Sequence, residues 1–108
     1  MVKQVQVPDL TVNGTSYRGV TISRVWYGDG TTALVADQAE GPLARLTVNL
    51  GAYGLFPVDG GVFLDLNNCG EGIAQELVRV GVVTLTGRTE WYGFGCQAVE
   101  AVLAEKLQ

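Results

Sequence analysis

Fifteen glycines divide this 108-residue chain into short apolar stretches, and this punctuation limits the folds that the chain can adopt. The clearest stretch runs from Ala44 to Leu50. Its alternate residues Ala44, Leu46, Val48 and Leu50 are apolar and would share one face of a strand, whereas the residues between them are polar. Successive side chains of a strand point to opposite faces, so this pattern predicts a strand with one packed and one solvated face. The chain is therefore expected to form a series of short, mostly antiparallel strands.

Turn residues support this interpretation at three places. Asn13–Gly14 and Asp29–Gly30 favour hairpins, because glycine accepts the positive φ that a tight turn requires. A third turn is expected at Glu40–Gly41–Pro42. Between residues 19 and 27 the apolar alternation slips by one position near Ser23–Arg24, which predicts a β-bulge. The expected strands lie at residues 2–7, 19–27, 31–36, 44–50, 62–66 and 83–85, with a further piece at 89–95.

One segment repeats with a helical period instead. The apolar residues at this spacing are Ile73, Leu77 and Val80. Gly81 is placed to end the helix in a left-handed conformation, and Asn68 with Glu71 resembles a capping box at its start. The pattern predicts one amphipathic helix over residues 70–80. Residues 96–108 combine helix-favouring alanines and glutamates with valines that suit a strand, so both conformations stay open for this segment.

These elements predict an α+β fold: one bent, mostly antiparallel sheet of five to six strands with a single amphipathic helix packed on it. The length suits a single domain over residues 1–108. No apolar run approaches the roughly 18 residues of a membrane span, and the alternating start differs from the apolar core of a signal peptide. A cytoplasmic protein without membrane association is therefore expected.

The charge pattern bears on the kind of partner. Eleven acidic and seven basic residues give a formal net charge of −4, and the acidic residues are spread singly along the chain. A surface that follows nucleic-acid phosphates normally needs a basic patch. Direct nucleic-acid binding is therefore not expected.

Catalytic candidates are few because the chain contains no histidine, the usual general base and commonest metal ligand. Cys69 and Cys96 are isolated and are expected to be ordinary thiols, although a helix start near Cys69 could lower its pKa. Asp59, Asp65 and Glu71 could surround a divalent cation, but their spacing fits no known calcium loop. No catalytic residue, metal or cofactor is predicted. A small-ligand or divalent-cation binding domain built on these carboxylates is kept as an alternative.

Aromatic residues are the candidates for partner binding. Trp91, Tyr92 and Phe94 lie among glycines near the end of the chain, and Tyr53 and Phe56 lie in the loop before Pro57. Large aromatics are enriched at interface hot spots, although packing into the core or over the sheet end would also explain them. Trp91 and Tyr92 are adjacent, so in a strand they face opposite sides and at least one is a surface candidate.

Three pieces of the chain carry a family resemblance: residues 46–50, residues 62–72 and residues 77–88. Their motifs are Leu-Thr-Val-Asn-Leu, Val-Phe running to Gly-Glu-Gly, and Leu-Val followed by Gly-Val-Val and Thr-Gly-Arg. With this spacing the segment from Leu46 to Arg88 resembles small uncharacterised proteins encoded on bacterial integrative elements, plasmids and phages. The resemblance implies no catalytic residue.

The resemblance implies a genomic context in which small accessory proteins often bind host proteins. Together with the missing catalytic machinery and the surplus aromatics, it leads us to expect a non-enzymatic protein that binds a host protein or protein complex. The concrete expectation is an inhibitor of a host defence complex, similar to an anti-CRISPR protein, that acts by occlusion or sequestration. A self-associating structural protein, with a homodimer as its simplest form, is the other alternative.

Overall fold

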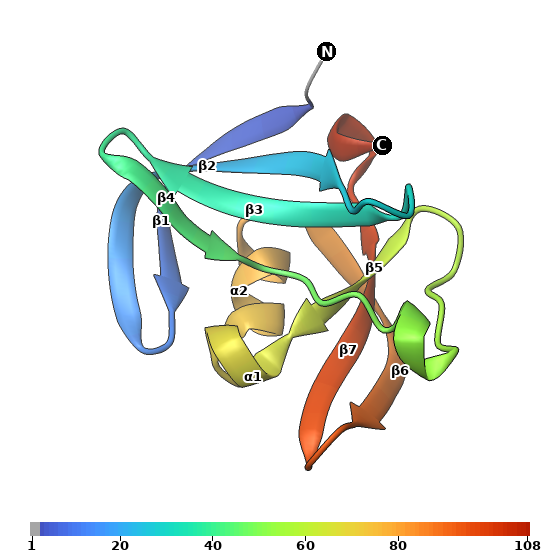
Figure 1. Cartoon of the computed structure of the whole chain (residues 1–108). Helices are drawn as coiled ribbons and strands as arrows, with labels where there is room; N and C mark the ends of the chain where they lie inside the picture. Colours follow the sequence, from blue (N-terminus) through green and yellow to red (C-terminus); the bar gives the residue numbers. More distant parts are fainter. Residues whose placement is uncertain (1–2) are drawn as a thin grey trace.

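The computed structural model describes residues 3–108, in which seven strands form two antiparallel sheets accompanied by short helices (Figure 1). The first sheet contains β1 (Gln4–Val12), β2 (Thr15–Trp26), β3 (Thr32–Gln38) and β4 (Gly41–Arg45) in that order. The second contains β5 (Gly61–Asp65), β7 (Cys96–Leu103) and β6 (Val83–Tyr92), with β7 in the middle. The helical elements are α1 (Leu66–Cys69), α2 (Ile73–Arg79) and the 3-10 turns η1 (Gly51–Tyr53) and η2 (Glu105–Leu107).

The first sheet is a meander whose three connections are the turns that the sequence predicts. Asn13 and Gly14 both have positive φ, 53° and 79°, as a two-residue hairpin turn requires. The predicted bulge at Ser23–Arg24 is wrong, because β2 stays in register with both neighbours there and the irregularity lies between Ala36 and Asp37 of β3. The apolar phase slips because Arg24 takes a position on the same face as Ile22, and its guanidinium donates to the Leu107 carbonyl oxygen.

The α+β class and the antiparallel pairing are confirmed, but the predicted single sheet of five to six strands is replaced by two sheets. The segment after β4 explains the difference. Leu46 donates its amide to Leu34 of β3 and accepts from the Asp65 amide of β5, and an isolated bridge joins Thr47 to Leu64. The chain thus passes from one sheet to the other over three residues. The predicted strand at 44–50 therefore ends early, at Arg45.

The helix predicted at 70–80 is observed as the shorter α2, Ile73–Arg79, and a second short helix that was not predicted, α1, precedes it at Leu66–Cys69. Gly70 separates them with φ of 91°, and a Cβ on it would approach Asn13 to within 3.2 Å, so only glycine fits against the first hairpin turn. The predicted capping box is wrong. Asp65, rather than Asn68, caps α1 by accepting the Asn68 amide, while Glu71 is exposed and the residue before α2 is Gly72.

Residues 96–108, for which the sequence allows helix or strand, form a strand followed by a 3-10 turn. The strand is favoured because β7 pairs on both sides, with β5 and with β6. One apolar core then joins the two sheets and α2, with Ile22 and Leu34 from the first sheet, Leu64 from the second and Leu77 from the helix all fully buried. No helix within residues 3–108 is long and apolar enough to cross a bilayer.

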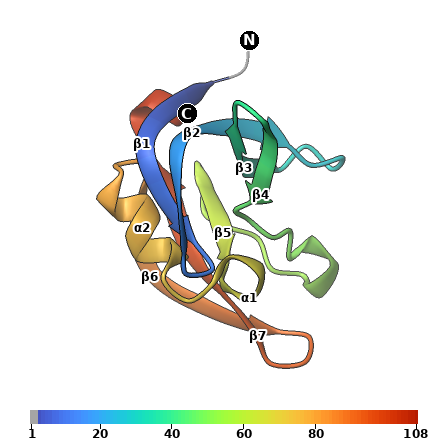
Figure 2. The ribbon, with the colours of Figure 1, turned by 90° about the vertical axis from the view of Figure 1, so that its left-hand side faces the viewer.

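Helix α2 also covers the free edge of the first sheet, between β1 and β6 (Figure 2). The Glu76 carboxylate accepts the Thr11 amide of β1 at 2.8 Å, and Arg79 pairs with Asp9 of the same strand at 2.6 Å. An uncovered strand edge can pair with another chain, so these contacts satisfy part of an edge that would otherwise be open.

Packing of α2 is tested by a matched pair of truncations. Leu77→Ala removes a fully buried side chain and is expected to lower the free energy of unfolding by about 2–5 kcal/mol. Val78→Ala, at the exposed neighbouring position, is expected to change it by less than about 0.5 kcal/mol. Urea denaturation followed by circular dichroism measures both, and equal losses would contradict this placement of the helix.

Candidate functional site

The hairpin that joins β6 to β7 carries the two most exposed aromatic side chains among the described residues. Phe94, at the tip of the hairpin, is fully exposed, with a relative accessibility of 106%, and Trp91 of β6 is 66% exposed. Tyr53, on the neighbouring turn η1, is 56% exposed. We refer to Tyr53, Trp91, Tyr92 and Phe94 as the hairpin surface. Figure 1 shows η1 and the β6–β7 hairpin at the same end of the second sheet.

Trp91 and Tyr92 face opposite sides of β6, as the alternation predicts. Tyr92 is half-buried beside the small cluster of Leu50, Phe63 and Ala98. Its ring contacts that of Tyr53 with centroids 5.6 Å apart, and burial raises the pKa of the Tyr92 phenol to about 12. Core packing therefore explains Tyr92 but leaves the exposure of its neighbour Trp91 unexplained.

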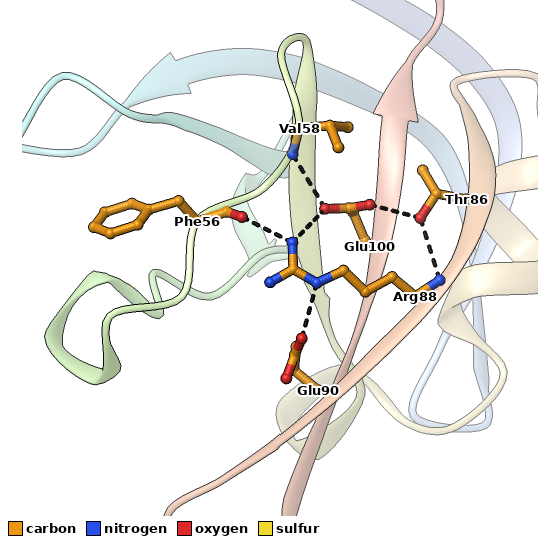
Figure 3. A network of polar contacts seen from close by, with 6 residues as sticks. All are labelled: Phe56, Val58, Thr86, Arg88, Glu90 and Glu100. Carbon is orange, nitrogen blue, oxygen red and sulfur yellow. Dashed lines mark hydrogen bonds and ion pairs between the residues drawn. The ribbon is translucent and has the colours of Figure 1, made fainter.

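Phe56 is exposed, yet the structure does not bring it together with the hairpin surface. Its ring lies near Gly51 and lines a small cavity with Tyr27 and Leu55. In Figure 3 the ring points away from the polar side chains of the second sheet. The sequence grouped Phe56 with Tyr53 because the two residues share a loop, but the loop directs their side chains to different places.

A buried ionic network fixes that loop to the second sheet (Figure 3). Glu100 of β7 is 2% exposed, and one carboxylate oxygen accepts the Val58 amide at 3.1 Å and an Arg88 guanidinium N–H at 2.9 Å. The Thr86 hydroxyl donates to the other oxygen at 2.7 Å. Arg88 also donates to the Phe56 carbonyl oxygen at 2.9 Å. Two backbone groups of the loop are therefore held by side chains from β6 and β7.

Sequence reasoning missed this network. The signal was present in Ala98-Val99-Glu100-Ala101-Val102, where a charged residue interrupts a strand that is otherwise apolar. A carboxylate at such a position needs hydrogen bonds and a cation, because burying an unpaired charge is costly. Arg88 supplies the cation, and its guanidinium also pairs with Glu90 at 2.8 Å and lies 5.1 Å from the centre of the Phe63 ring.

Glu100 stays ionised in this setting. Burial alone would raise the pKa of its carboxyl, but the hydrogen bonds from Thr86 and the Val58 amide, with the bond and charge of Arg88, outweigh burial and lower the pKa. Hydrogen bonds to Glu90 and Glu100 raise the pKa of Arg88 in turn. The pair is therefore charged at neutral pH.

Glu100→Gln is expected to lower the free energy of unfolding by about 1–3 kcal/mol, because the buried hydrogen-bonding site keeps its shape but loses its charge. Since the Glu100 pKa lies below the ordinary value of 4.5 in the folded chain, its contribution is complete above pH 4.5 and disappears as the pH falls through the lowered pKa. Urea denaturation from pH 7 to pH 3 measures this difference. Glu90→Gln, which removes the more exposed partner of Arg88, is the control and is expected to cost less.

The three carboxylates considered for a cation site do not converge. Asp65 is buried and accepts the backbone and side-chain N–H groups of Asn68, whereas Glu71 and Asp59 are exposed on different turns. Asp65, Arg45 and Tyr27 are among the residues that line an open cavity of about 720 Å³. Within the described range 3–108, no three His, Cys, Asp or Glu side chains form a group that could hold a metal ion.

Both cysteines are free thiols. Cys69 ends α1 instead of preceding a helix, and its thiol donates to the Arg45 carbonyl oxygen. Burial, together with the charge of Asp65, raises the pKa of Cys69 to about 11, so the suggested lowering by a helix start is wrong. Cys96 is partly exposed at the start of β7.

The two thiols are expected to react at different rates with an aromatic disulfide reagent at pH 8. Cys96 should react in the native protein, and Cys69 should react only after unfolding, because it is buried and protonated. Thiol release followed by absorbance measures both phases, and Cys96→Ser should remove the fast phase alone. Two fast thiols in the folded protein would contradict the placement of Cys69.

A groove runs between α1 and the β6–β7 hairpin, on the Trp91 side. It has a volume of about 220 Å³, and its lining residues are Leu66, Asn67, Glu71, Trp91, Gly95, Cys96 and Gln97. Glu71 is the one charged residue in this lining. The sequence drew attention to Glu71 and Trp91 for separate reasons and could not show that they share a groove.

Comparison of the chain with protein-family models, curated proteins and solved structures finds no match. The proposals below therefore depend on the geometry of the chain and on the resemblance noted in its sequence.

Proposed function

We propose that this chain is a non-enzymatic protein-binding protein that docks through the hairpin surface. The observation that carries the proposal is the exposure of Phe94 and Trp91 on one hairpin. Large aromatic side chains on a rigid support are typical interface anchors, because they bury much area and lose little rotamer freedom on binding. Neither ring is used to build the core, so their role lies outside the fold.

The framework beneath the hairpin surface supports the same proposal. The Glu100–Arg88 network anchors the loop at Phe56 and Val58, and the Tyr53–Tyr92 contact joins η1 to β6. A surface held in this way loses little conformational entropy when a partner binds. The backbone of β6 and of η1, which supports the hairpin surface, is therefore preorganised for binding.

The resemblance to proteins of mobile genetic elements favours a host protein as the partner. We propose that the chain inhibits a host defence complex by covering or sequestering one component, in the manner of an anti-CRISPR protein. A net charge of −4 suits a basic surface on that component, such as one that normally contacts nucleic acid. A second copy of the chain is the alternative occupant, and concentration-dependent mass by light scattering distinguishes it from a host protein.

The test is affinity capture from bacterial lysate with the tagged chain and with the double variant Trp91→Ala, Phe94→Ala. The parent is expected to retain a defined protein, and the variant to bind that protein, once purified, at least about 30-fold more weakly, as for two truncated hot-spot residues. Binding is measured by calorimetry with the purified proteins. Both side chains are exposed, so the variant is expected to keep the parent circular dichroism spectrum.

Trp26→Ala is the matched control, since Trp26 is also exposed but lies at the end of β2, outside the hairpin surface. It should retain the captured protein with parent affinity. Capture that is equally strong with all three proteins would contradict the hairpin surface as the interface.

A further inference from the structure

We propose that the groove beside Trp91 receives a single arginine side chain of the protein partner. This inference deepens the proposed function and rests on it, because it specifies the partner's chemistry at one edge of the hairpin surface. The groove lies where α1 meets the start of β7, so a partner that covers Trp91 also covers the opening between Asn67 and Gln97.

The polar side chains of the groove have no hydrogen-bond partner within the described part of the chain. Asn67, Glu71, Trp91 and Gln97 all line it, and none donates or accepts a side-chain hydrogen bond among residues 3–108. Their hydrogen-bonding capacity is available to a ligand.

The larger cavity beside Asp65 differs in this respect. Apart from Arg45, its polar side chains are already engaged: Asp65 accepts from Asn68, Tyr27 bonds Thr47 at 2.8 Å, and the Cys69 thiol donates to a carbonyl oxygen. Groups that are satisfied inside the fold have little to gain from a ligand. The small groove is therefore the stronger candidate site.

The charge of Glu71 favours a cationic side chain of the partner in this groove. Glu71 is exposed and forms no ion pair within the described residues, and no basic residue lines the groove. The amide oxygens of Asn67 and Gln97 add acceptors for N–H donors. The volume of about 220 Å³ is below the range of typical small-molecule pockets, and it suits one side chain.

Trp91 selects arginine over lysine. A guanidinium is planar, so it can stack on an indole ring and direct N–H groups to a carboxylate at the same time. Three arginines of this chain already lie over aromatic rings at 5.1–5.5 Å, Arg24 over Trp26 among them. Trp91 has no such cation among the described residues, although tryptophan is the ring that binds cations best.

The two tryptophans make the test internally controlled. The probe is the blocked tripeptide acetyl-Gly-Arg-Gly-amide, added to the ¹⁵N-labelled full chain at constant ionic strength while the two indole N–H resonances are followed by NMR. The Trp91 resonance is expected to shift saturably. The Trp26 resonance should stay in place although its ring is 53% exposed, because the Arg24 guanidinium already lies 5.3 Å from the ring centre and repels a second cation. The same tripeptide with neutral citrulline in place of arginine should leave both resonances unchanged.

Glu71→Gln is expected to weaken the response of Trp91 to the arginine tripeptide by about 3- to 10-fold, through loss of the charge-assisted bond. The Glu71 side chain forms no ion pair within residues 3–108, so an unchanged amide spectrum should confirm that this variant is folded. Equal shifts of the two indoles, an equal response to the citrulline peptide, or an undiminished response in Glu71→Gln would each overturn the inference.

The result separates this inference from the proposed function. If Trp91→Ala, Phe94→Ala abolishes capture of the partner while the arginine tripeptide leaves Trp91 unmoved, the interface stands and the arginine site is overturned. If the tripeptide binds at Trp91 while capture is unaffected by the double variant, the groove binds a guanidinium but does not receive the captured partner, and the proposed interface is overturned.

Discussion

Strand β5 is buried on both faces, and this constraint organises the second half of the chain. All five of its residues, Gly61–Asp65, are buried. Val62 and Leu64 pack into the core shared with the first sheet and α2, so the face that carries Phe63 needs a separate cover. The loop from Leu50 to Val58 provides that cover. A loop that lies on a sheet carries backbone N–H and C=O groups that need partners, and the Glu100–Arg88 network satisfies two of them.

The tight packing at Gly61 shows how close the loop lies. A Cβ at this position would come within 2.8 Å of the Val58 carbonyl oxygen and 3.1 Å of the Ala101 carbonyl oxygen. Tyr53 lies beside Tyr92 because the loop that carries Tyr53 covers the Phe63 face of β5. The support of the hairpin surface and the core of the second sheet are consequently one structure, and a change at Glu100 is expected to disturb both.

The sheet edges are managed in two ways, and the difference affects recognition. Helix α2 satisfies part of the β1 edge through Glu76. Strand β6 instead carries a register irregularity between Leu85 and Thr89, with Gly87 at φ of 91° and the Arg88 amide bonded to the Thr86 hydroxyl. Such a bulge discourages edge-to-edge pairing of strands. Recognition at this hairpin is therefore expected to use side chains more than backbone.

Local chemistry decided which parts of the fold could be predicted from the sequence. The turn at Asn13–Gly14 follows from the conformational preference of two adjacent residues, and the opposite orientation of Trp91 and Tyr92 follows from alternation. The passage of Leu46 from β3 to β5 depends on residues almost 20 positions away, which the local pattern of residues 44–50 does not contain. The apolar alternation there reports burial, and burial alone does not distinguish a paired strand from an extended crossover.

In the candidate site, too, the features set by local sequence could be predicted, and those set by distant residues could not. Exposure of one of the two aromatics was expected, but the choice of Trp91 depends on Tyr53 covering Tyr92 from a distant loop. Phe56 was grouped with Tyr53 by proximity in sequence, but Gly54, with φ of 73° at the end of η1, turns the chain between them. Glu71 was assigned to a helix cap because the break at Gly70 depends on contact with Asn13, a residue of the first hairpin.

The distribution of charge explains why the carboxylate in the groove beside Trp91 has no ion pair among the described residues. Five of the seven basic residues are used inside the molecule: Lys3 donates to the Gln108 carbonyl oxygen, Arg24 and Arg45 lie over aromatic rings, and Arg79 and Arg88 form ion pairs. The ion pairs neutralise Glu100 and the carboxylates at the edge of β1, but none reaches Glu71 within the described residues. The fold thus uses its cations for its own stability and leaves this carboxylate uncompensated beside an exposed indole. A cation from outside the chain can stack on Trp91 and neutralise Glu71 together, which no residue of the described chain does.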